Sequence, residues 1–252
     1  MPTILVTGGG RGIGRAVALS FAEPGSTVAI AARTRTQLDD TANAIRGRGA
    51  TPLVLPLDVT DERAVAAAFG ELRKSSDGLD VIVNNAGIGG GAPIHETDTT
   101  SWRRILDTNL WGMFLVTRQA VPLLHDGGRI VNMSSVLGRF GVRGYTAYCA
   151  SKHAVIGFTR ALALELAERG VTVNAVCPGW VDTAMAAQGM QSGATSMGVS
   201  FEEFRAAALD EVPIKRIIEP GEVAALVKFL ASPQAAAITG QTYNICGGRS
   251  MD

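Results

Sequence analysis

Tyr148 and Lys152 are side chains whose types and spacing suit acid–base chemistry. They are four residues apart in a segment with helical periodicity, so we expect them on one face of a helix. A free tyrosine hydroxyl, with a pKa of about 10, is a poor acid–base group at neutral pH. An ammonium within about 4–6 Å stabilises the phenolate, so we expect Lys152 to bring the pKa of Tyr148 toward neutral pH.

Two further polar residues complete the candidate catalytic set. Ser135 follows a predicted strand, and Asn109 lies inside a long helical pattern. The Ser135 hydroxyl can hydrogen-bond a carbonyl oxygen, which Tyr148 protonates while a hydride reaches the carbon. Lys152 can also donate to ribose hydroxyls. Since Tyr–Lys pairs at this spacing also occur by chance in long helices, the hypothesis depends on Ser135 and on the cofactor features described next.

A glycine-rich turn follows the first predicted strand and precedes a predicted helix. It reads Thr7-Gly8-Gly9-Gly10-Arg11-Gly12-Ile13-Gly14, with the spacing GxxxGxG through Gly8, Gly12 and Gly14. Such a turn lets the backbone N–H groups at a helix start approach a pyrophosphate. No Lys-Ser or Lys-Thr pair follows, so the turn is not a P-loop.

The end of the second predicted strand indicates which dinucleotide binds. An acidic side chain there would accept hydrogen bonds from a ribose hydroxyl, as in NAD sites. The chain has no acid at this point and instead carries Arg33. Arg33 can hold a 2′-phosphate, and Arg11 can add a second positive charge. The sequence therefore favours NADP(H), with NAD(H) as the alternative if both arginines are merely solvated.

The next two strand ends carry residues that suit the rest of a dinucleotide. Asp58 can accept a hydrogen bond from an adenine amino group, and the small residues of Asn85-Ala86-Gly87 would let a ribose lie against the backbone. Ligands of such sheets bind outside the carboxyl ends of the strands. Each group, taken alone, is equally compatible with ordinary turn chemistry.

These residues must be positioned by an alternating β/α pattern. Seven segments rich in β-branched residues predict strands at 3–7, 27–31, 53–57, 80–84, 129–133, 171–176 and 241–245. Helical patterns lie at 13–24, 35–48, 61–75, 100–124, 146–169, 202–210 and 221–231, with Gly25 and Gly170 at C-cap positions. Several strands are apolar throughout, which is typical of a parallel sheet covered on both faces. We therefore predict a single doubly wound α/β domain over residues 1–252, with a seven-stranded parallel sheet and helices on both faces.

Residues 184–212 interrupt this pattern. They contain Met185, Met190 and Met197, several Gly and Ser residues, and only weak helical periodicity. A long interruption in a compact α/β domain is usually functional or disordered, and methionine adapts to irregular apolar shapes. We predict a substrate lid, with a plain surface insertion as the alternative.

Composition excludes several classes of protein. The 252 residues carry 23 basic and 23 acidic side chains, which argues against nucleic-acid or polybasic membrane binding. No apolar run is long enough to span a bilayer, and residues 1–6 do not resemble a signal peptide. The three cysteines have no CxxC spacing and the three histidines are scattered, so we expect no disulfide framework, no metal and a cytoplasmic setting.

The chain resembles the short-chain dehydrogenase/reductase family over essentially its whole length. The resemblance rests on the glycine turn, Asp58, Asn84-Asn85-Ala86-Gly87, Asn109, Ser135, Tyr148-Cys149-Ala150-Ser151-Lys152 and Pro178-Gly179-Trp180-Val181-Asp182-Thr183. It implies a Rossmann-type fold with a Ser–Tyr–Lys site, in which Asn109 supports a water relay from Lys152. It further implies that the cofactor contacts Ile13, Val59, Pro178, Gly179, Val181 and Thr183, and that the protein forms a homotetramer.

Two segments narrow the expected function within this family. Gly87-Ile88-Gly89-Gly90-Gly91 and the C-terminal Tyr243-Asn244-Ile245-Cys246-Gly247-Gly248 are similar to bacterial ketoreductases that act on β-ketoacyl or aromatic polyketide substrates. The expected activity is NADPH-dependent reduction of a small-molecule or carrier-bound ketone. The alternative enzyme is a dehydrogenase that oxidises a free secondary alcohol, sugar or hydroxy acid. A non-catalytic dinucleotide sensor is disfavoured because the acid–base set is intact.

Overall fold

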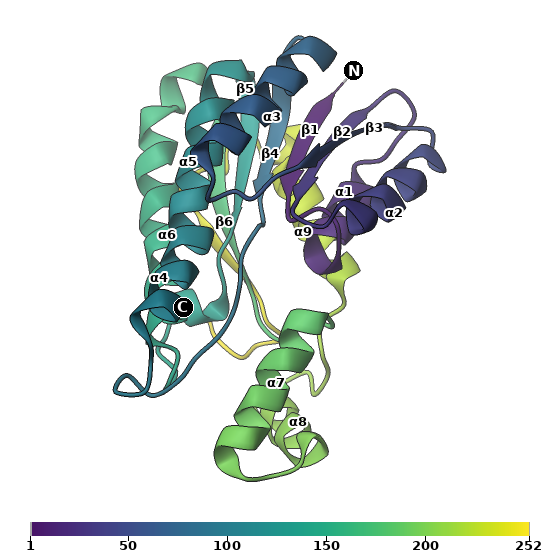
Figure 1. The fold of residues 1–252 in the computed structure, drawn as a ribbon. Helices are drawn as coiled ribbons and strands as arrows, with labels where there is room; N and C mark the ends of the chain where they lie inside the picture. Colours follow the sequence, from purple (N-terminus) through teal and green to yellow (C-terminus); the bar gives the residue numbers. More distant parts are fainter. Residues whose placement is uncertain (1, 252) are drawn as a thin grey trace.

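The computed structural model describes residues 2–251 and contains one parallel sheet (Figure 1). Within these residues the sheet has seven strands in the order β3-β2-β1-β4-β5-β6-β7. The strands are β1 (Thr3–Thr7), β2 (Thr27–Ala32), β3 (Thr51–Pro56), β4 (Leu79–Asn84), β5 (Leu124–Met133), β6 (Thr172–Pro178) and β7 (Thr242–Ile245). The strand order reverses between β1 and β4, which is where such sheets bind ligands at their carboxyl ends. The predicted doubly wound fold is confirmed.

Helices cover both faces of the sheet (Figure 1). They are α1 (Gly12–Ser20), α2 (Arg35–Arg46), α3 (Glu62–Ser75), α4 (Thr99–Leu106), α5 (Gly112–Ala120), α6 (Thr146–Glu165), α7 (Ala184–Met197), α8 (Phe201–Asp210) and α9 (Pro220–Leu230). Alternate side chains of β1 enter different cores, because successive residues of a strand point to opposite faces. Ile4 and Val6 pack with α1, α2 and α9, whereas Leu5 packs with α3, α5 and α6.

The predicted helix over 100–124 is divided in the structure. A π-helical turn, Asp107–Trp111, separates α4 from α5, and β5 already begins at Leu124. Such turns add a residue locally and often occur at functional sites. Here the turn carries Asn109, which is fully buried. The interruption was not predicted because a single added residue barely changes the apolar periodicity.

The two predicted helix caps had different outcomes. Gly170 has a left-handed φ of 63° and ends the 3-10 turn that follows α6, so this cap is confirmed. Gly25 is not a cap, because α1 ends at Ser20 with Phe21 as its C-cap. Pro24 lies beyond this end and cannot continue a helix, and Gly25 forms the following turn at φ 88°.

Residues 184–212 form two helices, α7 and α8, that extend beyond the carboxyl edge of the sheet (Figure 1). Helix α7 was not predicted, because its Gly and Ser residues lower helix propensity. Its N-cap Thr183 accepts a hydrogen bond from the Ala186 N–H. A Cβ on Gly193 would lie 2.3 Å from the Phe204 ring, so this glycine allows the two helices to pack closely.

Residues 2–251 contain neither a membrane-spanning helix nor a metal-binding cluster. No helix there combines the length and apolarity needed to cross a bilayer. No group of three or more His, Cys, Asp or Glu side chains in this part of the chain is placed to hold a metal ion.

Candidate active site

Ser135, Tyr148 and Lys152 come together at the carboxyl end of β5. Ser135 caps a short 3-10 turn, with its Oγ accepting from the Leu137 N–H at 3.1 Å. The Ser135 side chain lies near that of Tyr148 and lowers the pKa of the tyrosine. The Lys152 Nζ lies 5.7 Å from the centroid of the Tyr148 ring and donates to the Met133 carbonyl at 2.9 Å. The structure therefore brings together three of the four predicted catalytic residues by direct contacts.

Asn109 connects the π-helical turn to the same site. Its Oδ1 accepts from the Ile88 N–H at 2.8 Å, and its Nδ2 donates to the Ile88 carbonyl at 3.0 Å and to the Ser151 Oγ at 3.1 Å. A Cβ on Gly87 would lie 3.1 Å from the Asn109 Oδ1 and 3.6 Å from the Lys152 Nζ. Gly87, which follows the end of β4, therefore lies close to both the Asn109 side chain and the Lys152 ammonium.

The pKa of Tyr148 differs from the expectation. Burial raises it to about 12, and the hydrogen bond from Ser135 offsets only part of this effect. Burial also lowers the pKa of Lys152 to about 8. The prediction that Lys152 brings the pKa of Tyr148 toward neutral is wrong for this structure. Removing the phenolate from water is the largest effect, and Lys152, with a pKa of about 8, is uncharged at the pH where Tyr148 would ionise.

The glycine turn between β1 and α1 is crowded. A Cβ on Gly14 would lie 2.1 Å from the Gly8 carbonyl oxygen, and Gly12 has a left-handed φ of 52°. The Asn85 amide donates to the Thr7 carbonyl at 3.0 Å and to the Gly8 carbonyl at 3.4 Å. The predicted ribose-side residue Asn85 therefore also holds the turn in shape.

The start of α1 suits an anion. Its N-cap, Arg11, makes no side-chain capping bond, and its first turn has no acidic residue. The first N–H groups of a helix have no partner within the helix, and they attract negative charge. The turn and helix start therefore fit the pyrophosphate of a dinucleotide.

Arg33 and Asp58 lie beside one another at the ends of β2 and β3. The Arg33 Nη1 is 3.7 Å from the Asp58 Oδ2, and the two side chains are 65% and 40% exposed. The other Asp58 oxygen accepts from the Thr60 N–H at 3.0 Å and its hydroxyl at 2.8 Å. The ion pair between Arg33 and Asp58 was not predicted. The pairing is loose, so Arg33 keeps most of its donors available to a phosphate.

The segment after β6 lies across the glycine turn. A Cβ on Gly12 would be 3.2 Å from the Thr183 Cγ2, which joins regions far apart in the chain. The Gly179 N–H donates to the Ile245 carbonyl at 3.0 Å, next to the end of β6 at Pro178. Val181 forms an isolated bridge with Ile218.

Two other predicted cofactor contacts lie largely within the cores. Val59 is buried, and a Cβ on Gly112 would lie 2.6 Å from its Cγ2. Ile13 is half-buried and packs against the core that contains α1. Side-chain contact between a cofactor and Val59 is therefore limited, although its backbone follows Asp58 at the strand end.

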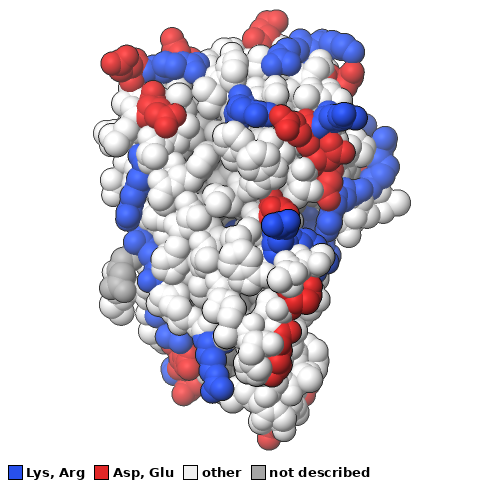
Figure 2. All heavy atoms as spheres, turned by 60° about the vertical axis from the view of Figure 1, so that its left-hand side comes forward, with Lys and Arg blue, Asp and Glu red and all other residues white. Residues whose placement is uncertain are grey.

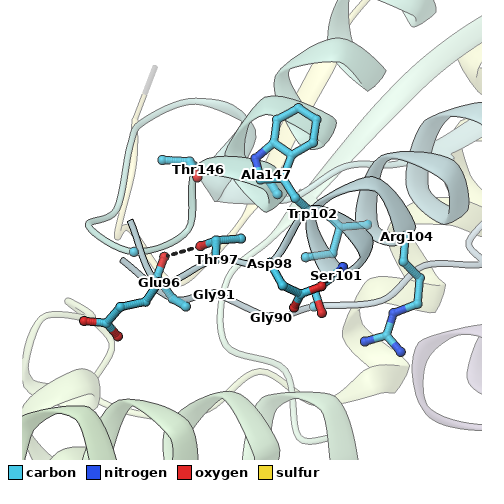
Figure 3. A pocket seen from close by; sticks show the side chains of 14 residues that line it. Gly90, Gly91, Glu96, Thr97, Asp98, Ser101, Trp102, Arg104, Thr146 and Ala147 are labelled. Carbon is cyan, nitrogen blue, oxygen red and sulfur yellow. Dashed lines mark hydrogen bonds between the residues drawn. The ribbon is translucent and has the colours of Figure 1, made fainter. Parts of the chain in front are cut away.

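A cavity of about 200 Å³ opens between the segment after β4, the start of α4 and the segment before α6 (Figure 3). Gly89, Gly90, Gly91, Ala92, Glu96, Thr97, Asp98, Ser101, Trp102, Arg104, Ile105, Gly144, Thr146 and Ala147 line it. Small residues and backbone form one wall, and Ala147 adjoins Tyr148 in α6. Helix α7 reaches this region, since a Cβ on Gly89 would lie 3.7 Å from the Met185 Cγ. Sequence patterns did not indicate the cavity, because its polar lining residues have no distinctive spacing.

Comparison with known proteins identifies the family. A family model described as enoyl-(acyl carrier protein) reductase, one of the short-chain dehydrogenase/reductase models, matches residues 8–250. The chain belongs to the short-chain dehydrogenase/reductase family. It is an oxidoreductase of this family, as the resemblance predicted.

The relatives are ketoacyl reductases. A protein named ketoacyl reductase 1 of the granaticin polyketide synthase of Streptomyces violaceoruber is 39% identical, over 98% of this chain and 92% of that protein. The 3-oxoacyl-(acyl-carrier-protein) reductase of Vibrio harveyi is 38% identical, over 98% of this chain and 96% of that protein. A crystal structure of an actinorhodin polyketide ketoreductase variant with NADPH has a TM-score of 0.93 and 41% identity, over 98% of this chain and 97% of that one.

Proposed function

We propose that this protein reduces a ketone to a secondary alcohol with NADPH as the hydride donor. The observation that carries the proposal is the grouping of Ser135, Tyr148 and Lys152, with the Lys152 Nζ 5.7 Å from the centroid of the tyrosine ring, at the strand edge that also carries the glycine turn. When bound, NADPH supplies a hydride to the carbonyl carbon. Side chains of this protein bind the substrate carbonyl, transfer the proton and hold the cofactor.

The four polar residues divide the remaining work. Ser135 donates a hydrogen bond to the substrate carbonyl oxygen, and Tyr148 transfers its phenolic proton to that oxygen as general acid. Lys152 holds the cofactor ribose, and its ammonium, 5.7 Å from the centroid of the Tyr148 ring, stabilises the phenolate that the proton transfer leaves. Asn109 fixes the backbone beside Lys152, where its contacts with Ile88 support a water relay toward solvent.

The pKa of Tyr148 keeps this residue in the protonated form that reduction uses. A tyrosine with a pKa of about 12 carries its proton throughout the neutral range, which is the form that a general acid requires. Oxidation of an alcohol would require the phenolate as general base, and burial opposes this form. With pKa about 8, Lys152 can exchange a proton near neutral pH and so resupply Tyr148.

The charge at the ends of β2 and α1 favours NADPH over NADH. Arg33 and Arg11 are both exposed, and no acidic side chain ends β2. Asp58, the nearest acid, is already bonded to Thr60 and faces Arg33. A 2′-phosphate would meet Arg33 in a charge-assisted and partly bidentate contact, whereas a free ribose hydroxyl would gain little from it.

The substrate we propose is a β-ketoacyl or polyketide-like ketone, either free or attached to a carrier. Relatives with these names cover nearly the whole chain. The cavity near Gly89 adjoins Tyr148, and its wall of small residues leaves room for a substrate larger than a simple ketone. We propose that α7 and α8 act as a substrate lid, because Met185 of α7 lies next to Gly89, which lines this cavity.

We also propose that the protein is a homotetramer that works in the cytoplasm. The face formed by α4 to α6 has few charged side chains (Figure 2). Leu164 of α6 is 81% exposed and Trp111 is 46% exposed, and a partner subunit would cover both. The three cysteines are unpaired and buried, which suits a reducing compartment.

The proposal is tested by following NADPH oxidation with β-keto thioesters, decalones and quinones, for the wild type and for Tyr148→Phe. The variant keeps the ring and loses the proton, and general acid catalysis contributes about 10²–10⁴-fold. We expect turnover with at least one ketone, its near-loss in the variant, and NADPH affinity close to wild type. Retention of more than about a tenth of the wild-type kcat would exclude Tyr148 as the acid.

A further inference from the structure

Two consecutive residues at the end of β5 hold both ends of Lys152. The Lys152 Nζ donates to the Met133 carbonyl at 2.9 Å, and the Ser134 hydroxyl donates to the Lys152 carbonyl at 2.8 Å. Lys152 is 4% exposed and Ser134 is 3% exposed, so bulk water does not compete for either bond. Two hydrogen bonds with residues at the end of β5 therefore fix the position of the Lys152 ammonium relative to Tyr148.

Ser134 is itself firmly placed. Its N–H donates to the Val176 carbonyl at 2.8 Å, which continues the pairing of β5 with β6. Its hydroxyl also contacts the Cys177 thiol. A Cβ on Gly138 would lie 2.6 Å from the Ser134 Oγ and 2.8 Å from the Lys152 carbonyl, so a larger residue at Gly138 would separate them.

The first turn of α6 lacks the usual capping contacts. Its N-cap, Tyr145, makes no side-chain capping bond, and its first turn has no acidic residue. Side-chain caps typically stabilise a helix start by about 1 kcal/mol, so this turn lacks a usual restraint. The bond from Ser134 supplies a restraint from outside the helix one turn further along, at Lys152, because a carbonyl oxygen has a second lone pair beyond the one used in the helix.

We propose that Ser134 is a positioning residue for Lys152, acting through the backbone of α6 rather than on the substrate. The inference rests on the proposed function, in which Lys152 serves both turnover and cofactor binding. A displacement of roughly 1 Å in such a group can reduce turnover by about 10²-fold. Without the Ser134 hydroxyl, the lysine keeps its charge and its burial but loses one of its two fixed points.

The test compares Ser134→Ala with a matched control, Ser26→Ala. Ser26 is also 3% exposed, and its hydroxyl also donates to backbone carbonyls at 2.8 Å, in the connection between α1 and β2. Both variants lose buried hydrogen bonds and should have a similarly lowered Tm. We expect Ser134→Ala to lower kcat and weaken NADPH binding by about tenfold or more, and Ser26→Ala to change both by less than about twofold.

A double variant shows whether Ser134 acts through Lys152. NADPH affinity is measured by fluorescence titration in Lys152→Met, with and without Ser134→Ala. We expect no further weakening from the second change, because the lysine through which the serine acts is gone. An equal weakening in both backgrounds, or a Ser134→Ala single variant with kcat and affinity within about twofold of wild type, would overturn the inference.

Failure of the proposed function would look different. If Lys152→Met alone left turnover and NADPH affinity unchanged, the role of Lys152 would be wrong and the inference about Ser134 would fall with it. If Lys152→Met showed both losses and Ser134→Ala neither, only the inference would fail. Should circular dichroism show Ser134→Ala to be unfolded, Ser134→Cys is judged by the same criteria, since a thiol is a weaker donor than a hydroxyl.

Discussion

Replacing Lys152 with methionine should make the protein without cofactor more stable at neutral pH. Burial lowers the pKa of Lys152 from 10.5 to about 8, so the folded state holds the charged lysine at a penalty. A pKa difference of about 2.5 at about 1.4 kcal/mol per pH unit corresponds to roughly 3 kcal/mol. The substitution also removes the bond to the Met133 carbonyl, worth about 1 kcal/mol. We therefore expect Lys152→Met to be more stable than wild type by about 2 kcal/mol at pH 7.

The pH dependence has a defined sign. Below pH 8 the lysine is charged in both the folded and the unfolded wild type, so the penalty is present in full. Between pH 8 and 10.5 the unfolded chain binds more protons than the folded one, so the stability of the wild type rises with pH. The advantage of the variant should therefore shrink by about 1.4 kcal/mol per pH unit and reverse near pH 10.

The measurement is guanidinium unfolding of both proteins at one protein concentration, at pH 7.0 and at half-unit steps to pH 10.5. Lys74→Met is the control, because the Lys74 side chain is 72% exposed and pairs only with Glu71 at the surface. Its stability relative to wild type should stay constant over this range. A Lys152→Met protein that is less stable than wild type at pH 7, or whose stability difference does not change with pH, would refute the assignment of a buried, penalised charge.

Three further predictions concern cofactor and substrate. Arg33→Asp should lower kcat/KM for NADPH by about tenfold or more and raise that for NADH, since a charge-assisted bond to phosphate is lost; an unchanged preference ratio would place the selection elsewhere. Gly14→Ala should abolish NADPH binding in a fluorescence titration, because its Cβ would lie 2.1 Å from a backbone carbonyl of the turn, whereas Gly157→Ala, with open space around it in α6, should bind normally. Met185→Ala should raise KM for a bicyclic ketone with little change in NADPH affinity, whereas Met197→Ala, 67% exposed at the far end of α7, should not; equal KM values in both variants would indicate a static insertion.

The sheet and the glycine turn could be predicted because their signals are local. Apolar runs such as Thr27–Ala32 are needed wherever a strand is covered on both faces, and a turn as crowded as that at Gly14 accepts only glycine. The four polar residues proposed for the site could be nominated from the sequence, because the proposed chemistry requires particular side chains. In each case the residue type itself carries the information.

Features that depend on tertiary packing were not predictable in the same way. Helix α7 has weak propensity, and it forms because Thr183 caps it and Gly193 lets it pack against Phe204. The π-helical turn at Asn109 is held by two bonds to Ile88, whose position depends on where β4 ends. The partners involved are distant in the sequence, and no local pattern indicates them.

The error about Tyr148 has the same origin and bears on the mechanism. Spacing places an ammonium beside the phenol, which alone would lower the pKa of the tyrosine. Burial acts on both groups at once, raising the pKa of Tyr148 and lowering that of Lys152, and its extent is set by the cores around β5 and α6. The resulting pair, a protonated phenol beside an amine that exchanges protons near neutral pH, is consistent with the proposed transfer of a proton from Tyr148 to a ketone. The free energy of unfolding that the protein loses by burying Lys152 follows from the lowered pKa of this lysine. The unfolding experiment on Lys152→Met therefore tests the pKa of Lys152 without any substrate.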